Sequence, residues 1–416
     1  MDLLDANVGN LKYELQDDTH TAAKIKVIGV GGGGSNAVAH MMEGGLEGVE
    51  FYVVNTDVQA LQACPVQNKL AIGCKITHGR GTGADPSIGR QAALDDTERI
   101  CEILEGADLV FVAAGLGGGT GSGAAPVIAS LGKEMGALTM AVATKPFTFE
   151  GARRRRQAEK GLEELAAIVD AVITVSNDRL LTLAPRGTSL VEAFRMGHDF
   201  LRRTVSDIVE IMTTPGFINR DFSDVRSTMF GAGCALLGTA TASGEGAAVK
   251  AAKEAIGCPL LEGAGIKGAQ SVLLNIVGSS RLGLHDVHEA CELIRAATEN
   301  EDVEVNFGVV LNEAMEDSVK VTVIATGFAR QRSVPARELE PEEEPVAAAA
   351  QTLWLSEMEP ERAAAAPPVA PEPEPPAAPR ATTGYPVPPP APAPVEEEED
   401  LNDLDTPAYL RRRALQ

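Results

Sequence analysis

The chain has 416 residues, of which 59 are acidic and 36 are Lys or Arg, so its formal net charge at pH 7 is −23. An acidic balance of this size argues against bulk binding to nucleic acids or anionic membranes, which requires a basic surface. The six cysteines show no spacing typical of a metal site, so reduced thiols are expected.

The apolar runs of the sequence do not indicate a membrane-spanning segment. No basic region leads into a long apolar run at the start, and no stretch approaches the roughly eighteen unbroken apolar residues of a membrane span. The sequence therefore predicts a cytoplasmic protein without direct membrane insertion.

Glycine and proline divide the chain near residue 330. All but one of the 42 glycines precede residue 331, whereas 18 of the 25 prolines follow it. Residues 1–22 are polar and unpatterned, which predicts a flexible segment. Residues 331–400 are rich in Pro, Ala and Glu. Such a segment cannot bury enough apolar area to offset the conformational entropy lost on folding, which predicts a disordered linker. Residues 401–416 regain apolar side chains beside three arginines, as is typical of a docking peptide on a tether.

Apolar strands alternate with helical patterns over residues 23–187. Such alternation indicates a Rossmann-like α/β domain, in which helices cover both faces of a parallel sheet and ligands bind at the carboxyl ends of the strands. The expected strands are 24–30, 48–57, 69–73, 108–115, 138–147 and 171–178, with helices after the first strand and near 87–105, 124–135 and 154–167.

A long helix is predicted over 188–214, because apolar residues from Leu190 to Met212 recur at spacings near three, four and seven until Pro215. Residues 215–330 then form a smaller α+β domain suited to support or subunit contact. Its expected strands are 234–242, 271–278, 303–311 and 319–328, with helices near 246–256 and 286–299.

Two glycine-rich segments follow strands. The first satisfies GxGxxG through Gly29, Gly31 and Gly34, and with Asp57 at the end of the next strand it would alone predict NAD binding. The second, "GLGGGTGSG", follows the fourth strand. Two such loops suit a longer polyphosphate better, with hydroxyls from Thr120 and Ser122. The chain lacks GxxxxGK[ST], which disfavours an ordinary P-loop ATPase.

Residues suited to ribose and base lie further along the chain. Glu150 could bind ribose hydroxyls, and Arg154 could bind phosphate or base. On the long helix, Phe194 could stack on a base or pack in the core, and Asp199 could accept hydrogen bonds from guanine N1 and N2.

Six segments together resemble one family. They are "IKVIGVGGGGSNAV", "VEFYVVNTDVQAL", "GLGGGTGSGAAPVIA", "TKPFTFEGARRR", "INRDFSDV" and "DTPAYLRRR", and they resemble FtsZ, the tubulin-like GTPases of bacterial cell division. The resemblance covers nearly all of residues 24–330 and the final dozen. It implies a tubulin/FtsZ-like fold, in which the GTPase domain is joined by a long central helix to the smaller domain.

The resemblance also implies a GTP site. By it, the first loop would contact GTP through Gly32, Gly33, Gly34, Ser35 and Asn36, and the second through Gly119, Thr120 and Gly121. Glu150 and Arg154 match residues for ribose and phosphate, and Phe194 matches the residue that stacks on guanine. The position that is often an aspartate reading guanine holds His198, and Asp199 follows it, so either could meet the base.

Catalysis by the family uses a loop from the next subunit. Asn219, Asp221 and Asp224 match that loop and would complete the site, with Mg²⁺, only at a head-to-tail contact between copies. Arg220 departs from the family, which usually has an apolar residue there. The alternatives are a relative that assembles but hydrolyses little and an NAD enzyme.

The terminal peptide implies the partners. "DTPAYLRRR" resembles the segment that binds the membrane-tethering protein FtsA, and ZipA in some bacteria. The implied location is a mid-cell division ring at the inner face of the membrane.

Overall fold

The computed structural model describes residues 23–328, except residues 47, 186, 215, 219 and 259–264. The expected terminal segment 1–22, the linker 331–400 and the peptide 401–416 therefore lie outside the described residues, as does Asn219.

The described strands join into one ten-stranded sheet with the order β3-β2-β1-β4-β5-β6-β7-β10-β8-β9. They are β1 Ile25–Val30, β2 Val49–Asn55, β3 Asn68–Ala71, β4 Leu109–Gly115, β5 Leu138–Lys145, β6 Ala171–Ser176, β7 Gly233–Ser243, β8 Ser271–Gly278, β9 Glu304–Leu311 and β10 Ser318–Thr326.

The helices fall between these strands. They are α1 Gly31–Glu43, α2 Val58–Ala63, α3 Cys74–Thr77, α4 Pro86–Asp95, α5 Thr97–Leu104, α6 Gly119–Glu134, α7 Ala152–Ile168, α8 Asn177–Leu183, α9 Leu190–Thr213, α10 Phe222–Met229, α11 Ala247–Ile256 and α12 Leu284–Thr298, with 3₁₀ turns η1 Thr148–Glu150 and η2 Glu313–Met315. No described helix has the length and apolar character needed to cross a bilayer.

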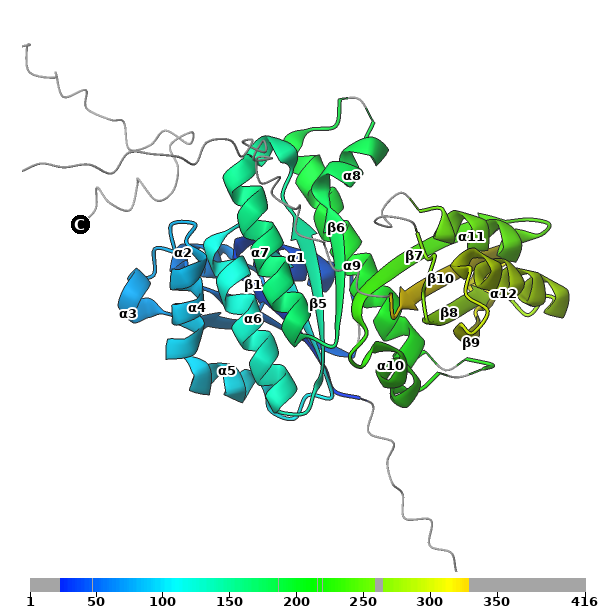
Figure 1. The fold of residues 1–416 in the computed structure, drawn as a ribbon, viewed down its shortest axis with the longest axis horizontal. Coiled ribbons are helices and arrows are strands. Elements are labelled where there is room, and N and C mark those ends of the chain that lie inside the picture. The colour runs from blue at the N-terminus through cyan, green and yellow to red at the C-terminus, as the bar shows by residue number, and fades with distance from the viewer. Residues whose placement is uncertain are drawn as a thin grey trace, which may run out of the picture. The chain divides into compact units, whose positions relative to one another are not determined.

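Strands β1 to β6 pair in parallel, and the core lies on both of their faces. One face packs against α4, α5, α6 and α7, which lie in front of the strands in Figure 1. The other face packs against α1, α9 and α10. This confirms the predicted parallel sheet with two covered faces.

Strand β7 belongs to both halves of the sheet. Its first three residues, Gly233 to Ala235, pair in parallel with β6, and its remaining length pairs antiparallel with β10. Helices α11 and α12 cover one face of β7 to β10. Leu237, Leu273 and Ile324 from the other face join the core that contains α9, so α9 packs against both halves.

The helices near the site differ from the sequence prediction in where they begin and divide. The helix expected over 87–105 is divided into α4 and α5 at Asp96, whose Oδ2 accepts the backbone N–H of Gly73 at 2.7 Å. Helices α1 and α6 begin at Gly31 and Gly119. The two expected glycine loops are therefore largely the first turns of helices.

An ion cluster ties α9 to β10. Lys320 Nζ lies 2.8 Å from Asp207 Oδ1 and 2.7 Å from Glu210 Oε2, and the Asp207 side chain is only 5 % exposed. Burial raises the pKa of Asp207 despite its lysine partner. Burial would lower the pKa of Lys320, but the attraction of the two carboxylates outweighs it and the pKa is raised. Lys320 therefore stays charged and compensates a buried carboxylate.

We expect Lys320→Met to lower the free energy of unfolding by about 3 kcal/mol, because Asp207 would be left buried without its counter-charge. Lys267→Met is the matched control, since the Lys267 and Glu299 side chains are 56 % and 58 % exposed and such surface pairs contribute about 1 kcal/mol or less. Denaturant titration of the full chain measures both. Equal effects of the two changes would contradict this account of the cluster.

Candidate functional site

A cavity of about 230 Å³ opens at the carboxyl ends of the parallel strands. It is formed by the starts of α1 and α6, by η1 and α7, and by the first turns of α8 and α9. Nine residues expected to contact the nucleotide line it: Gly32, Gly33, Gly119, Thr120, Gly121, Glu150, Arg154, Phe194 and His198. The fold thus brings together residues from five elements that are spread along the sequence, namely α1, α6, η1, α7 and α9.

Helices α1 and α6, whose glycine first turns line the cavity, lack capping side chains. The N-cap residues of α1 and α6, Val30 and Gly118, make no side-chain cap hydrogen bond, and neither first turn holds an acidic residue. By contrast, Asp85 and Ser189 cap α4 and α9. The first N–H groups of α1 and α6 are therefore left to a ligand, and the two helix dipoles favour an anion.

The glycines of the two segments have different surroundings. A Cβ on Gly32 or Gly118 would meet no atom within 4 Å, so these glycines present open backbone to the cavity. A Cβ on Gly34 would collide with the carbonyl oxygen of Ala113, and one on Gly119 with Thr82 Oγ1. Gly34 and Gly119 are thus required for close packing, although the N–H side of Gly119 still lines the cavity.

Several polar residues of these segments do not face the cavity. Ser35 is buried, with a hydroxyl that has no hydrogen-bond partner among the described residues, and Asn36 is exposed outside the lining. Ser122 Oγ accepts the Gly117 N–H at 2.8 Å. Thr120 lines the cavity, and its hydroxyl shares a hydrogen bond of 2.7 Å with Thr56. Ser122 therefore shapes the turn instead of offering a hydroxyl to a ligand.

Glu150 and Arg154 form one wall. Glu150 Oε1 accepts the Phe147 N–H at 2.8 Å, and its Oε2 lies 3.0 Å from Arg154 Nη1. Phe194 packs edge-on against Phe147 with ring centroids 5.2 Å apart, and 37 % of Phe194 remains exposed. A phenylalanine held on one side and exposed at a cavity can accept a stacked base.

The structure adds Asn177, which sequence reasoning missed. It is 7 % exposed and lines the cavity, and its Oδ1 has no hydrogen-bond partner among the described residues. Its only sequence signal was its place directly after β6, at the sheet edge where ligands bind. Thr82 and Thr144 also line the cavity without having been singled out.

His198 and Asp199 diverge although they are adjacent. His198 lines the cavity, whereas Asp199 does not. Asp199 Oδ1 lies 2.8 Å from His40 Nε2 on α1 and 3.5 Å from Arg202 Nε. Burial opposes ionisation, but the hydrogen bond and charge of His40, with Arg202, hold the pKa of Asp199 below its ordinary value. The Asp199 carboxylate therefore pairs with His40 and Arg202 outside the cavity.

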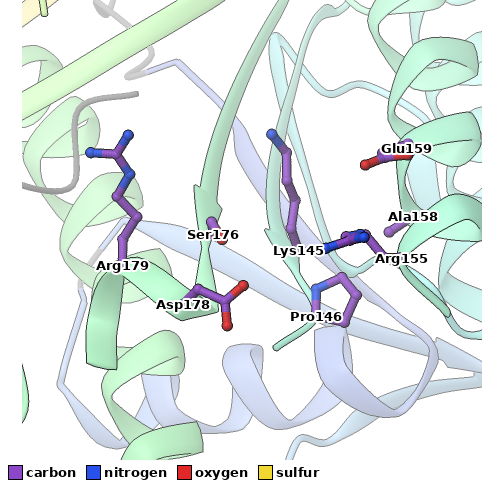
Figure 2. Close-up of a pocket in the computed structure, with 8 residues that line it drawn as sticks. All are labelled: Lys145, Pro146, Arg155, Ala158, Glu159, Ser176, Asp178 and Arg179. Atoms are coloured by element: carbon purple, nitrogen blue, oxygen red, sulfur yellow. The ribbon is translucent and has the colours of Figure 1, made fainter. Parts of the chain in front are cut away.

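A second cavity of about 330 Å³ adjoins the first and shares Pro146 with it (Figure 2). Figure 2 shows Lys145 and Arg179 extending in the same direction, with Arg155 and Glu159 supplied by α7. Asp178 in this cavity accepts the Thr148 N–H at 2.9 Å. Because Thr148 begins η1, this bond helps to hold the turn that carries Glu150.

The two predicted catalytic carboxylates lie beyond the other end of α9. Asp221 caps α10: its Oδ1 accepts the Asp224 N–H at 3.0 Å, and Asp224 Oδ2 faces the Asp221 N–H at 3.4 Å. Arg220 Nη1 lies 3.4 Å from Asp224 Oδ2, and its Nε donates to the Phe307 carbonyl at 2.8 Å. Since α9 continues for 15 residues beyond His198 to its end at Thr213, about 22 Å of helix separates these acids from the cavity of the same molecule.

Comparison with known proteins identifies the family. Residues 24–185 match the model for the GTPase domain of the Tubulin/FtsZ family, and residues 233–329 match the FtsZ family C-terminal domain. An empty FtsZ dimer from M. jannaschii is 36 % identical, with a TM-score of 0.68, over 74 % of this chain and 89 % of that one. The chain belongs to the tubulin/FtsZ family.

Two further neighbours extend the match. CetZ2 from Haloferax volcanii, solved as a GTPγS-bound protofilament, is 26 % identical with a TM-score of 0.66 over 74 % of this chain and 94 % of that one. CetZ1 from the same organism, a GDP-bound monomer, shares the fold at 23 % identity and a TM-score of 0.63, over 74 % of this chain and 95 % of that one.

Membership of this family makes the protein a GTP-binding GTPase. The expected tubulin/FtsZ-like α/β fold is confirmed. The NAD alternative depended on Asp57, which instead caps α2 by accepting the Gln59 N–H at 2.9 Å. That carboxylate is therefore part of a helix cap and does not line the cavity.

We expect Gly118→Val to raise the Kd for GDP about a hundredfold, because the new side chain would occupy the anion's place against unpaired helix N–H groups. The thermal unfolding midpoint should stay unchanged, since nothing lies within 4 Å of the new Cβ. Gly34→Ala should instead lower the free energy of unfolding by about 3 kcal/mol. Nucleotide titration and thermal unfolding distinguish the two, and a destabilised Gly118→Val would contradict this assignment.

Proposed function

We propose that the protein is a polymerising GTPase whose copies join head to tail and hydrolyse GTP at each contact. One observation carries the proposal: the cavity and the carboxylates Asp221 and Asp224 lie at opposite ends of α9. Neither can meet the other within one molecule, but they can meet between copies. A contact between two different surfaces repeats without closing, so it builds a filament.

Exposed apolar side chains near both ends support such a contact. Beside the carboxylates, Phe217 is 79 % and Phe230 is 61 % exposed, and Phe217 lines a cavity of about 680 Å³ with Leu284 and Leu311. Near the GTP cavity, Phe149 and Leu190 are 63 % and 60 % exposed. Exposed apolar groups gathered around polar residues are typical of interaction surfaces.

The proposed roles follow this arrangement. The first turns of α1 and α6 hold the phosphates, Glu150 and Arg154 meet ribose and phosphate, and Phe194 stacks on guanine. The carboxylates of the next copy orient the attacking water, together with Asn219, which lies outside the described residues.

Mg²⁺ fits a site of this kind. No cluster of three His, Cys, Asp or Glu side chains that could hold a metal occurs among the described residues, but Mg²⁺ needs only one or two carboxylates when substrate phosphates and water complete its shell. Asp221 and Asp224 of the docked copy would supply them. When bound, the ion neutralises phosphate charge.

Arg220 favours a slow form of this activity. Its guanidinium neutralises Asp224 within the same molecule, at 3.4 Å. Asp224 must exchange this partner to act on the next copy's nucleotide, which is expected to slow hydrolysis without changing the assignment as a GTPase.

The cellular role proposed is the cytokinetic ring of a dividing bacterial cell. Two solved relatives, at 36 % and 26 % identity, come from M. jannaschii and Haloferax volcanii, so the support for a bacterial setting is the terminal peptide "DTPAYLRRR". Tyr409 and Leu410 would anchor it on FtsA or ZipA, which would hold the cytoplasmic filaments at the membrane at mid-cell.

A mixing experiment tests the shared site. Asp224→Asn keeps the GTP cavity but should lower phosphate release about a hundredfold, and Gly118→Val keeps the carboxylates but should bind GTP poorly. Combined in equal amounts, they should recover up to about a quarter of wild-type turnover, since a random contact pairs the two intact surfaces about one time in four.

The control for charge loss is Glu102→Gln, an exposed acid on α5, which should leave turnover unchanged. Sedimentation with GTP against GDP monitors assembly in the same samples. A mixture no more active than its two components, or turnover per molecule that is independent of concentration, would refute hydrolysis at the contact.

Deletion of residues 404–416 tests the proposed adaptor peptide. Pelleting with GTP should match the full chain, because the peptide follows the predicted linker and lies outside the described residues. Capture by immobilised FtsA should be lost. Replacing Arg411, Arg412 and Arg413 with Gln should weaken capture without altering assembly, and unchanged capture after the deletion would contradict the assignment.

A further inference from the structure

Two residues of the cavity that come late in the sequence carry side chains that can form hydrogen bonds with a base. They are Asn177 at the start of α8 and His198 on α9. A Cβ on Gly197 would lie 3.4 Å from Asn177 Oδ1, so this amide sits against α9 beside His198. Both lie in the cavity that Phe194 also lines.

Asn177 presents an acceptor that needs a donor. Its Oδ1 is buried without a hydrogen-bond partner among the described residues. Leaving such an oxygen unpaired is unfavourable, so a ligand N–H is expected to fill the position. Guanine offers two kinds of donor on one edge, N1–H and the 2-amino group. If Asn177 Oδ1 accepts one of these donors, the other needs a second acceptor.

His198 supplies that second acceptor when it is neutral. Burial lowers the pKa of His198, the charge of His40 lowers it further, and Asp199 opposes both. A neutral imidazole has one acceptor nitrogen and one N–H, whereas the protonated ring has two donors and no acceptor. The other charged groups in the cavity wall are Glu150 and Arg154, which pair with each other at 3.0 Å.

We propose that the neutral imidazole of His198, and not Asp199, accepts a hydrogen bond from the 2-amino group of guanine and so distinguishes guanine from hypoxanthine in this chain. This inference rests on the proposed function and names how its base site selects the nucleotide. Asp199 is directed to His40 and Arg202 instead. A single neutral hydrogen bond makes the selection modest and sensitive to acid.

The test compares GDP with inosine diphosphate, which lacks only the 2-amino group, by equilibrium titration of the full chain. At about pH 7.5 the wild type should bind GDP about three- to tenfold more tightly, as one neutral hydrogen bond allows. At a second pH, low enough to protonate the ring despite its lowered pKa, the preference should approach one, because the protonated ring can no longer accept. Ionisation of the phosphates is common to both nucleotides and cancels in the ratio.

Three variants isolate His198. His198→Ala should remove the preference at about pH 7.5 while leaving inosine diphosphate binding near wild type. His198→Gln keeps an acceptor that does not titrate, so it should keep the preference at both pH values. His285→Gln, on the exposed surface of α12, should behave as wild type. Thermal unfolding of each variant verifies that it is folded.

The outcomes separate this inference from the proposed function. A wild-type ratio retained in His198→Ala would show that another group reads the 2-amino position and would overturn the inference, while the GTP site itself would stand. Equal loss of both nucleotides in His198→Ala and His198→Gln would assign His198 to packing and also overturn it. Binding of neither nucleotide by the wild type would overturn the proposed function and this inference together.

Discussion

The glycine first turns of helices α1 and α6, which line one cavity, determine where this molecule can bind an anion. β1 and β4 are parallel neighbours in the sheet, so the helices that follow them start side by side. Val30 and Gly118 offer no side-chain cap, and the bare N–H groups of both helices face one cavity. An anion there satisfies donors that the chain leaves unpaired.

Helix α9 sets the spacing between the nucleotide cavity and the proposed catalytic carboxylates. Its first turns bring Phe194 and His198 to the cavity, and its far end leads into Asp221 and Asp224. Its middle is buried in a core formed with both halves of the sheet and is held at Asp207 by Lys320. A buried helix fixes this separation, so under the proposed function the carboxylates must come from a second copy.

The sequence predicted the strands, the long helix and the general position of the cavity, because unbroken apolar runs and helical spacing are local signals. It could not tell which glycine presents open backbone. Gly118 and Gly119 are adjacent and chemically identical, and they differ only in that Gly119 packs against Thr82 and Asp85. Asn177 carried no motif, since an unsatisfied oxygen is defined by burial.

Other residues could be singled out from the sequence, but each pattern fitted two structural roles. Asp221 and Asp224 are spaced as a helix cap as well as a catalytic pair, and the structure shows the cap. His198 and Asp199 could not be separated by sequence, because adjacent residues on a helix point about 100° apart and only the position of α1 shows which faces the cavity. Asp96 interrupts a helix by bonding to Gly73, which is 23 residues away.

The double membership of β7 has a mechanical consequence. Only Gly233, Cys234 and Ala235 join the two halves of the sheet through backbone pairing, whereas each half is internally bonded over much longer ladders. Any rotation of one half against the other concentrates its distortion at this short seam and at the surface of α9. Load passed along a chain of such molecules would therefore act first on these three residue pairs.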